Sequence, residues 1–144
     1  MATESVKYPQ FINMDAEIKA KYLDPLVSDP NTIFFKQDLG EAYLMAGVYG
    51  FMFDLKKTTK KIANIRVFDR WQDQYKVLFR VIAAADKKYD FEVLLDGAKT
   101  LKIVEEYANG GAQRLYEDAT LLNSSETLEK KIWGKIKAIS SKTE

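Results

Sequence analysis

Apolar side chains recur every three or four residues between positions 94 and 122, which is the spacing of one face of an α-helix. The triplet Asn109-Gly110-Gly111 interrupts this pattern, because interior glycines weaken a helix and both Asn and Gly tolerate the left-handed backbone that ends one. We therefore expect two helices that meet at a tight corner. The apolar register continues past the glycines, so a single kinked helix is the alternative, and a ligand-contacting turn is a third. The apolar positions are Leu101, Val104, Ala108, Ala112, Leu115, Ala119 and Leu122.

A second helix, predicted over residues 37–56, is apolar on nearly all sides. Its central part carries Glu41 as its single charge, and a helix of this composition is usually covered by other elements. Gly40, Gly47 and Gly50 fall within about 80° of one another on a helical wheel. This small-residue side predicts close approach by another helix, and the alternative is a surface that binds a partner protein.

Capping and turn signals place the other elements. Asp15 fits the N-cap of a short helix that ends near Leu23, and Asn123 fits the N-cap of the last helix. An amphipathic helix is predicted over residues 72–88. Short strands are predicted at 32–35, 62–67 and 89–95, with a core plug as the alternative for the first and a loop for the second.

The ends of the chain show no periodicity. Residues 1–13 predict an extended arm, and residues 140–144 predict a frayed tail. The predicted fold is therefore mainly α: a single-domain helical bundle over residues 1–144, with five or six helices and at most short strands.

Composition excludes several kinds of chemistry. The 144 residues include no cysteine and no histidine, which removes disulfides, thiolate or imidazole metal ligands, cysteine nucleophiles and Ser-His-Asp triads. We expect no cofactor and no metal site. The N-terminal residues do not resemble a signal peptide, and the longest uncharged run, Ala42–Phe53, is shorter than the roughly 20 residues that cross a bilayer. These features predict a cytoplasmic protein without a membrane partner.

One segment, residues 56–70, is strongly basic although the net charge of the chain is only +1. It carries six basic side chains against a single acidic one, Asp69. Basic runs attract phosphate, and a nearby aromatic ring, Phe68 or Trp71, can stack on a base. The segment is therefore a candidate contact for nucleic acid or an acidic partner, and the alternative is a solvated loop at the C-terminal end of a helix. The basic residues are Lys56, Lys57, Lys60, Lys61, Arg66 and Arg70.

Acidic residues offer a weaker case for catalysis. Metal-dependent nucleases use carboxylates with a nearby lysine, often spaced Glu-x-Lys on a strand. Glu17-Ile18-Lys19 and Glu129-Lys130-Lys131 have this spacing, but both lie on predicted helices. Glu105 and Glu106 diverge by about 100° on a helix and cannot share a metal ion. We therefore expect a protein that is not an enzyme, with a carboxylate-metal nuclease as the alternative.

The middle of the chain resembles a known family. The order of AYLMAGVYGF, KKTTKK, IRVFDRW, an amphipathic helix and LKIVEEYANGGAQRLYE is similar to small accessory proteins encoded beside bacterial and archaeal DNA phosphorothioation (Dnd) defence systems. The resemblance covers about residues 35–120 and is most specific at Glu105–Gly111. It implies a prokaryotic protein linked to modified-DNA restriction or phage defence that acts with other protein subunits, and it supplies no catalytic residues.

Two functional hypotheses follow. The first is a non-enzymatic accessory or adaptor protein of a prokaryotic DNA-modification or anti-phage system, which acts through protein–protein contacts. Its candidate interface residues are Gly40, Gly47, Gly50 and Trp71. The second is a DNA-binding module that uses the basic segment 56–70.

Overall fold

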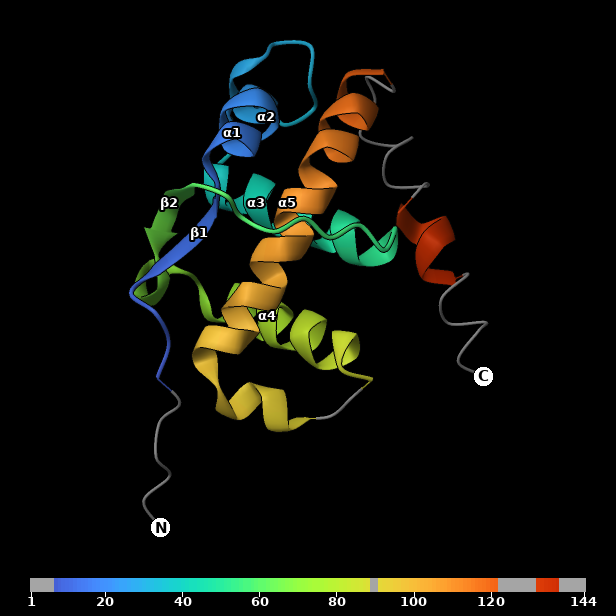
Figure 1. Ribbon diagram of the computed structural model, residues 1–144. Coiled ribbons are helices and arrows are strands. Elements are labelled where there is room, and N and C mark those ends of the chain that lie inside the picture. Colours follow the sequence, from blue (N-terminus) through green and yellow to red (C-terminus); the bar gives the residue numbers. More distant parts are fainter. Residues whose placement is uncertain (1–6, 89–90, 122–131, 138–144) are drawn as a thin grey trace.

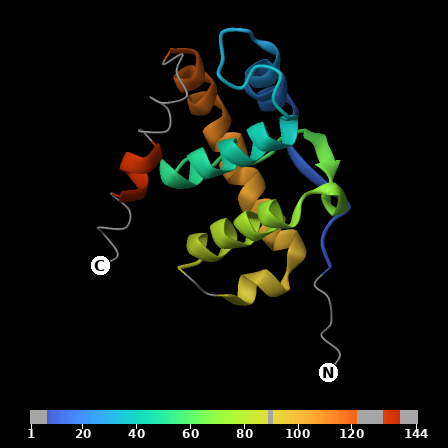
Figure 2. The ribbon, with the colours of Figure 1, turned by 180° about the vertical axis from the view of Figure 1, so that it is seen from behind.

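The longest helix, α5 (Gly97–Leu121), lies at the centre of the fold, and most other elements pack around it (Figure 1). The computed structural model describes residues 7–88, 91–121 and 132–137. Within them the two other long helices, α3 (Leu39–Met52) and α4 (Asp73–Asp86), both contact α5. Figure 2 shows these two helices from the opposite side, where they lie in front of α5. The predicted mainly α fold is confirmed.

The remaining elements are short. Two strands, β1 and β2, form an antiparallel sheet, and a helical stretch follows β1 directly. None of the helices within the described residues has the length and apolar composition that a membrane crossing requires. The short elements are β1 (Phe11–Asp15), α1 (Ala16–Ile18), the π-helical turn η1 (Lys19–Leu23), α2 (Asp24–Ser28), β2 (Ile62–Val67), and the 3-10 segments η2 (Phe68–Arg70) and η3 (Phe91–Leu95).

The glycine pair in α5 does not end the helix. The predicted corner at Asn109-Gly110-Gly111 is wrong, because α5 continues without a break from Gly97 to Leu121. A Cβ atom on Gly110 would overlap the carbonyl oxygen of Leu55, and one on Gly111 would overlap the backbone of α3. These glycines therefore allow other backbone segments to lie directly on α5, and this close packing outweighs their weak helix propensity.

The glycines of α3 take part in the same close packing. A Cβ atom on Gly50 would overlap the carbonyl oxygen of Tyr107, and one on Gly47 would touch Val104. Both contacts lie on α5, as the prediction of a closely approaching helix requires. Gly40 lies at the start of α3, where a Cβ atom would meet the guanidinium of Arg66.

The core is one continuous cluster of apolar side chains between α3, α4 and α5. Aromatic rings fill its centre: Trp71 is 3% exposed and packs against Tyr43, Tyr75 and Phe79. Edge-to-face contacts of this kind stabilise a core beyond the burial of area alone.

Several local predictions need correction. Part of the predicted extended arm is a strand, because Phe11–Asp15 pairs with Ile62–Val67, which confirms the strand predicted at 62–67. No strand forms at 32–35, where the chain turns and Thr32 is buried, or at Phe91–Leu95, which is a 3-10 segment. The helix after Asp15 continues through Pro25 to Ser28, since a proline fits the first turn of α2. The predicted last helix from Asn123 falls mostly outside the described residues.

Candidate nucleic-acid interface

The basic segment begins with a stretch of extended chain that crosses α5. We call residues 54–61, between α3 and β2, the strap; Figure 1 shows it passing over the middle of α5. The chain turns into the strap at Asp54, whose φ of 55° is left-handed. The backbone N–H of Leu55 then bonds the carbonyl of Gly50 at 2.7 Å, and that of Lys57 bonds the carbonyl of Glu106 at 3.0 Å. The strap is therefore joined to both α3 and α5 through its backbone.

Asn109 on α5 holds the middle of the strap. Its side chain is 1% exposed, and its amide nitrogen donates to the carbonyl of Lys57 at 3.0 Å and to Thr59 Oγ1 at 2.9 Å. Its amide oxygen accepts from the backbone N–H of Asp15 at 2.8 Å. Every polar atom of this buried amide is thus engaged, as buried polar groups must be if they are to stabilise a fold. Asn109, predicted to end a helix, instead joins three segments.

Asp15 holds the end of the strap. One carboxylate oxygen accepts from the backbone N–H groups of Lys60 at 2.8 Å and Lys61 at 3.3 Å. The other accepts from Glu17 N at 3.1 Å and Ile18 N at 3.2 Å, which is the N-cap that the sequence predicts. The hydrogen bond from Lys60 is the main reason that the pKa of Asp15 lies below its ordinary value, although burial opposes it. One carboxylate therefore fixes both the strap and the start of α1.

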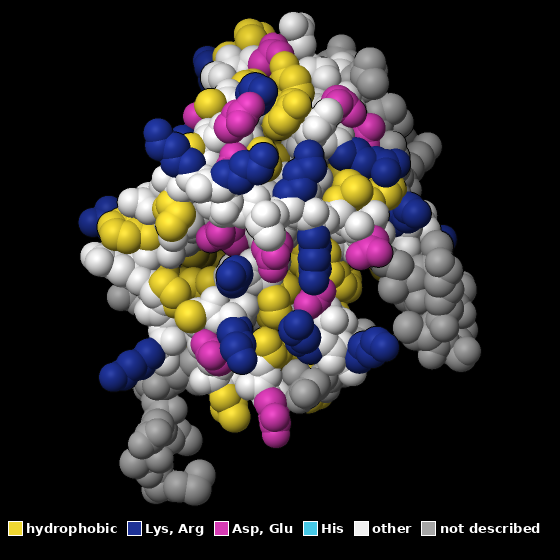
Figure 3. All heavy atoms as spheres, in the orientation of Figure 1, with side chains coloured by type: hydrophobic (Ala, Val, Ile, Leu, Met, Phe, Trp, Pro, Cys, Tyr) yellow, Lys and Arg dark blue, Asp and Glu magenta, His cyan; other side chains and the backbone are white. Residues whose placement is uncertain are grey.

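These bonds leave the lysines of the strap at the surface. Lys57, Lys60 and Lys61 are exposed, and within the described part of the chain none of them forms an ion pair. Dark-blue basic side chains form a band across the face of the molecule that the strap crosses (Figure 3). A fixed backbone with exposed ammonium groups is an arrangement suited to binding a phosphate chain.

Two of the other predicted basic residues are engaged within the fold. Lys56 pairs with Asp86 at 2.6 Å and lies over the ring of Tyr107. Burial raises the pKa of Asp86, but the bonds from Lys56 and Tyr107 outweigh this, and the pKa lies below its ordinary value. Arg66 pairs with Asp38 at 2.5 Å. The basic segment is therefore not one uniform patch.

A surface hollow of about 590 Å³ shows which cations come together. Lys56, Lys57 and Lys60 line it, and Lys61, Arg66 and Arg70 do not. Lys21, which no sequence pattern singles out, also lines it and pairs with Glu17 at 2.7 Å. No local sequence pattern links residues 15–22 to the strap; the pairing of β1 with β2 and the hydrogen bonds of Asp15 and Asn109 bring them together.

The predicted partner-interface residues are not at the surface. Gly40, Gly47 and Gly50 are buried in α3, and Trp71 is a core side chain. Arg66 lies over the Trp71 ring, with its guanidinium carbon 5.1 Å from the centroid, so the indole is not available to stack on a base. Phe68 is also buried, stacked on Tyr8 at 4.4 Å. Neither aromatic ring of the basic segment is therefore presented beside the lysines, whereas Tyr22 of η1 lines the hollow with them.

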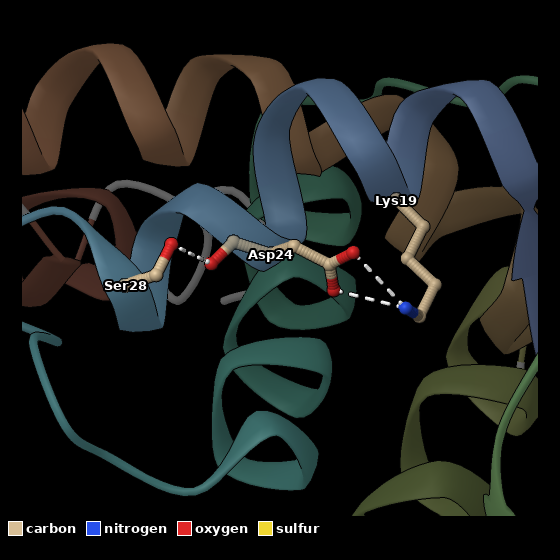
Figure 4. Close-up of polar contacts among 3 residues, drawn as sticks. All are labelled: Lys19, Asp24 and Ser28. Atoms are coloured by element: carbon tan, nitrogen blue, oxygen red, sulfur yellow. Dashed lines mark hydrogen bonds and ion pairs between the residues drawn. The ribbon is translucent and has the colours of Figure 1, made fainter.

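The first Glu-x-Lys triplet is divided between two separate ion pairs. Glu17 pairs with Lys21, whereas Lys19 reaches both carboxylate oxygens of Asp24, at 3.0 and 3.1 Å, across the π-helical turn (Figure 4). Ser28 Oγ donates to the carbonyl of Asp24 in the next turn. Among the residues that the structure describes, no three acidic side chains converge as a metal site would require. The second triplet, at Glu129, lies outside these residues.

The comparisons with known proteins agree with the resemblance. Residues 15–141 match the family described as DNA sulphur modification system-associated protein 4, and the chain belongs to that family. The match is wider than residues 35–120 and includes the end of β1, the strap and α5. The comparisons with curated proteins and with solved structures gave no match.

Proposed function

We propose that this protein is a non-enzymatic accessory factor of a DNA sulphur modification system, and that it contacts the DNA backbone through the strap. Membership of the family supports the link to such a system. The observation that supports DNA contact is the strap itself. Its backbone is bonded inward to Asp15, Asn109 and Glu106, while Lys57, Lys60 and Lys61 remain exposed.

Order in the strap favours binding because little conformational freedom remains to be lost. A flexible basic loop would lose backbone entropy of roughly 1–2 kcal/mol per residue fixed on binding. Here the N–H groups of Lys57, Lys60 and Lys61 are already hydrogen bonded to the fold. Only the lysine side chains need to become ordered, so electrostatic attraction is opposed by a smaller entropy loss.

The proposed contact reads charge and not base sequence. Lysine ammonium groups attract phosphate from any direction, and the nearby rings of Phe68 and Trp71 are buried. We expect binding of duplex DNA without sequence preference. Such a contact suits an accessory protein that stays near DNA while other components of the system act on it.

Fluorescence anisotropy of labelled duplex DNA tests this proposal. The strap variant Lys57→Glu, Lys60→Glu, Lys61→Glu should lose binding at low salt. The control variant Lys36→Glu, Lys88→Glu, Lys99→Glu changes the net charge equally at exposed positions outside the strap and should retain most of it. Equal affinities of the two variants would contradict the proposal, because only net charge would then matter.

A further inference from the structure

The hollow beside the strap has walls of two kinds. One wall is the strap itself, which carries lysines, and the other is formed by α1 and η1, which contribute the side chains of Ile18 and Tyr22. In Figure 1 the strap passes below α1 and across α5. The volume of about 590 Å³ lies within the roughly 300–1,000 Å³ typical of small-ligand sites. The hollow therefore offers charge on one side and an aromatic ring on the other.

Two lysines of the hollow are available to an anion. The charged side chains of its lining are Lys21, Lys56, Lys57 and Lys60, against Asp15 and Glu17. Glu17 pairs with Lys21, and Lys56 pairs with Asp86 of α4. Both oxygens of Asp15 already accept backbone N–H groups. Within the described residues Lys57 and Lys60 form no ion pair, so a ligand phosphate can reach both.

A second hollow, on the opposite side of the strap, has balanced charges. Its volume is about 400 Å³, and Lys60 and Lys102 line it together with Glu105 and Glu106. The strap crosses α5 at Glu106, where Lys57 N bonds the carbonyl, and the larger hollow lies beyond this point, toward Gln113. Two carboxylates beside two lysines give an anion no net attraction. A phosphate therefore favours the larger hollow.

Tyr22 places an aromatic ring in the larger hollow. Its side chain is half-buried, in contrast to the buried rings of Phe68 and Trp71. Tyr116 of α5 packs against it, with the ring centroids 6.3 Å apart. This contact holds the ring in place, and the part that Tyr116 leaves uncovered lines the hollow. Proteins that bind single strands stack bases on aromatic side chains of this kind, with little regard to base sequence.

We infer that the larger hollow binds an unpaired nucleotide of single-stranded DNA, with its base against Tyr22 and the adjoining phosphates on Lys57 and Lys60. This inference rests on the proposed function and names the form of DNA that the strap binds most tightly. A paired base cannot reach the ring, because it is held inside the stack of the duplex. Lys61 continues the row of cations outside the hollow, which suits a strand longer than one nucleotide. An acidic peptide would match the lysines but would leave the ring without a planar partner.

Fluorescence anisotropy with three DNA probes tests the inference. The probes are a blunt duplex, the same duplex with a short overhang of thymidines, and the same overhang with abasic sites in place of the thymidines. The two overhangs carry the same phosphates and differ only in their bases. The unchanged chain should bind the thymidine overhang about fivefold or more tightly than the abasic one, because that is the smaller end of what one base stacked on an aromatic ring contributes.

Substitutions of Tyr22 assign this difference to the ring. Tyr22→Leu keeps an apolar side chain against Tyr116 and should abolish the preference for bases, whereas Tyr22→Phe keeps the ring and should retain it. Tyr75→Leu is the matched control, because Tyr75 is also half-buried but lies on α4 and does not line the hollow. It should retain the preference. Each variant is compared with itself on the two overhangs, so a smaller folded fraction cannot imitate the loss.

The outcomes separate this inference from the proposed function. Equal affinity of the unchanged chain for the two overhangs would overturn the inference, and so would a preference for bases that Tyr22→Leu leaves intact. In either case, binding of the blunt duplex that Lys57→Glu, Lys60→Glu, Lys61→Glu abolishes would leave the proposed function standing. Absence of binding to all three probes at low salt would overturn both.

Discussion

Replacing Asp15 by asparagine tests how the strap is held. The carboxylate accepts from the strap through one oxygen and from the start of α1 through the other. An amide has only one oxygen, so the substituted side chain can serve the strap or the helix but not both. Its NH₂ group would face backbone N–H groups, which also donate. The substitution therefore removes two of the four hydrogen bonds and leaves two donors without partners.

The expected loss of stability in Asp15→Asn follows from the kind of hydrogen bond that is lost. Hydrogen bonds to charged groups contribute about 1.5–3 kcal/mol each, and an N-cap contributes about 1 kcal/mol. If the amide retains the cap, two bonds to the strap are lost, and we expect destabilisation of about 3 kcal/mol. That is a large part of the roughly 5–15 kcal/mol that stabilises a typical domain. Urea unfolding followed by circular dichroism measures this difference directly.

The pH dependence gives a second check on the same residue. The pKa of Asp15 is lowered in the folded chain, mainly by the Lys60 N–H, so the unfolded chain binds the proton more tightly. The stabilisation is therefore present above the unfolded pKa of about 3.9 and is lost as pH falls through the lower folded value. The difference between the unchanged chain and Asp15→Asn should shrink below about pH 4.

Glu17→Gln is the matched control for these measurements. Glu17 lies on the same turn, but its carboxylate is exposed and pairs with Lys21 at the surface. Surface pairs of this kind contribute little, so this variant should unfold at nearly the same urea concentration as the unchanged chain. If Asp15→Asn were as stable as Glu17→Gln at neutral pH, the described role of Asp15 would be refuted.

Three further predictions test the packing, the strap and its ligand. Gly50→Ala should destabilise the fold by about 1–3 kcal/mol or more in urea unfolding, because its Cβ would overlap the carbonyl of Tyr107. Gly134→Ala, which has open space, should be neutral or slightly stabilising. Asn109→Ala should speed hydrogen exchange of the strap amides more than that of other amides. Equally faster exchange throughout the chain would show that Asn109 does not hold the strap specifically. Duplexes with phosphate or phosphorothioate backbones should bind within about twofold in anisotropy titrations, because ammonium groups read charge; strong preference for either would require a contact beyond the lysines.

The sequence was sufficient for the parts of the fold that depend on local pattern. The apolar spacing of α4 and the nearly uncharged composition of α3 predict their helices within a few residues. Asp15 as an N-cap is also a local signal, readable from its position before Ala16–Ile18. These features need no knowledge of distant contacts, and for that reason the mainly α class could be predicted.

The errors lie where distant segments decide the local structure. Gly110 and Gly111 favour a helix end by propensity, yet Leu55 and α3 lie against them and the helix continues. The arm before Asp15 has no periodicity, and only its pairing with β2 makes it a strand. Tertiary contacts outweigh propensity at these positions, and propensity was the only information that the sequence provided.

Only the part of the candidate site that has a local signal could be predicted from the sequence. A run of lysines is visible in a sequence, so Lys57 and Lys60 were identified as candidate contacts. Asp15 is 45 positions from Lys60, and Asn109 is 52 positions from Lys57, so no local pattern reveals these connections.

The salt dependence of DNA binding shows most directly whether the strap contacts phosphate groups. Each phosphate neutralised on duplex DNA contributes about −0.9 to the slope of log K against log salt concentration. With Lys57, Lys60 and Lys61 in contact, the strap should contribute about −3 to this slope. We predict that Lys57→Glu, Lys60→Glu, Lys61→Glu removes this contribution, while Lys36→Glu, Lys88→Glu, Lys99→Glu leaves the slope nearly unchanged. A strap variant that binds duplex DNA with the slope of the unchanged chain would show that these lysines do not contact the phosphates.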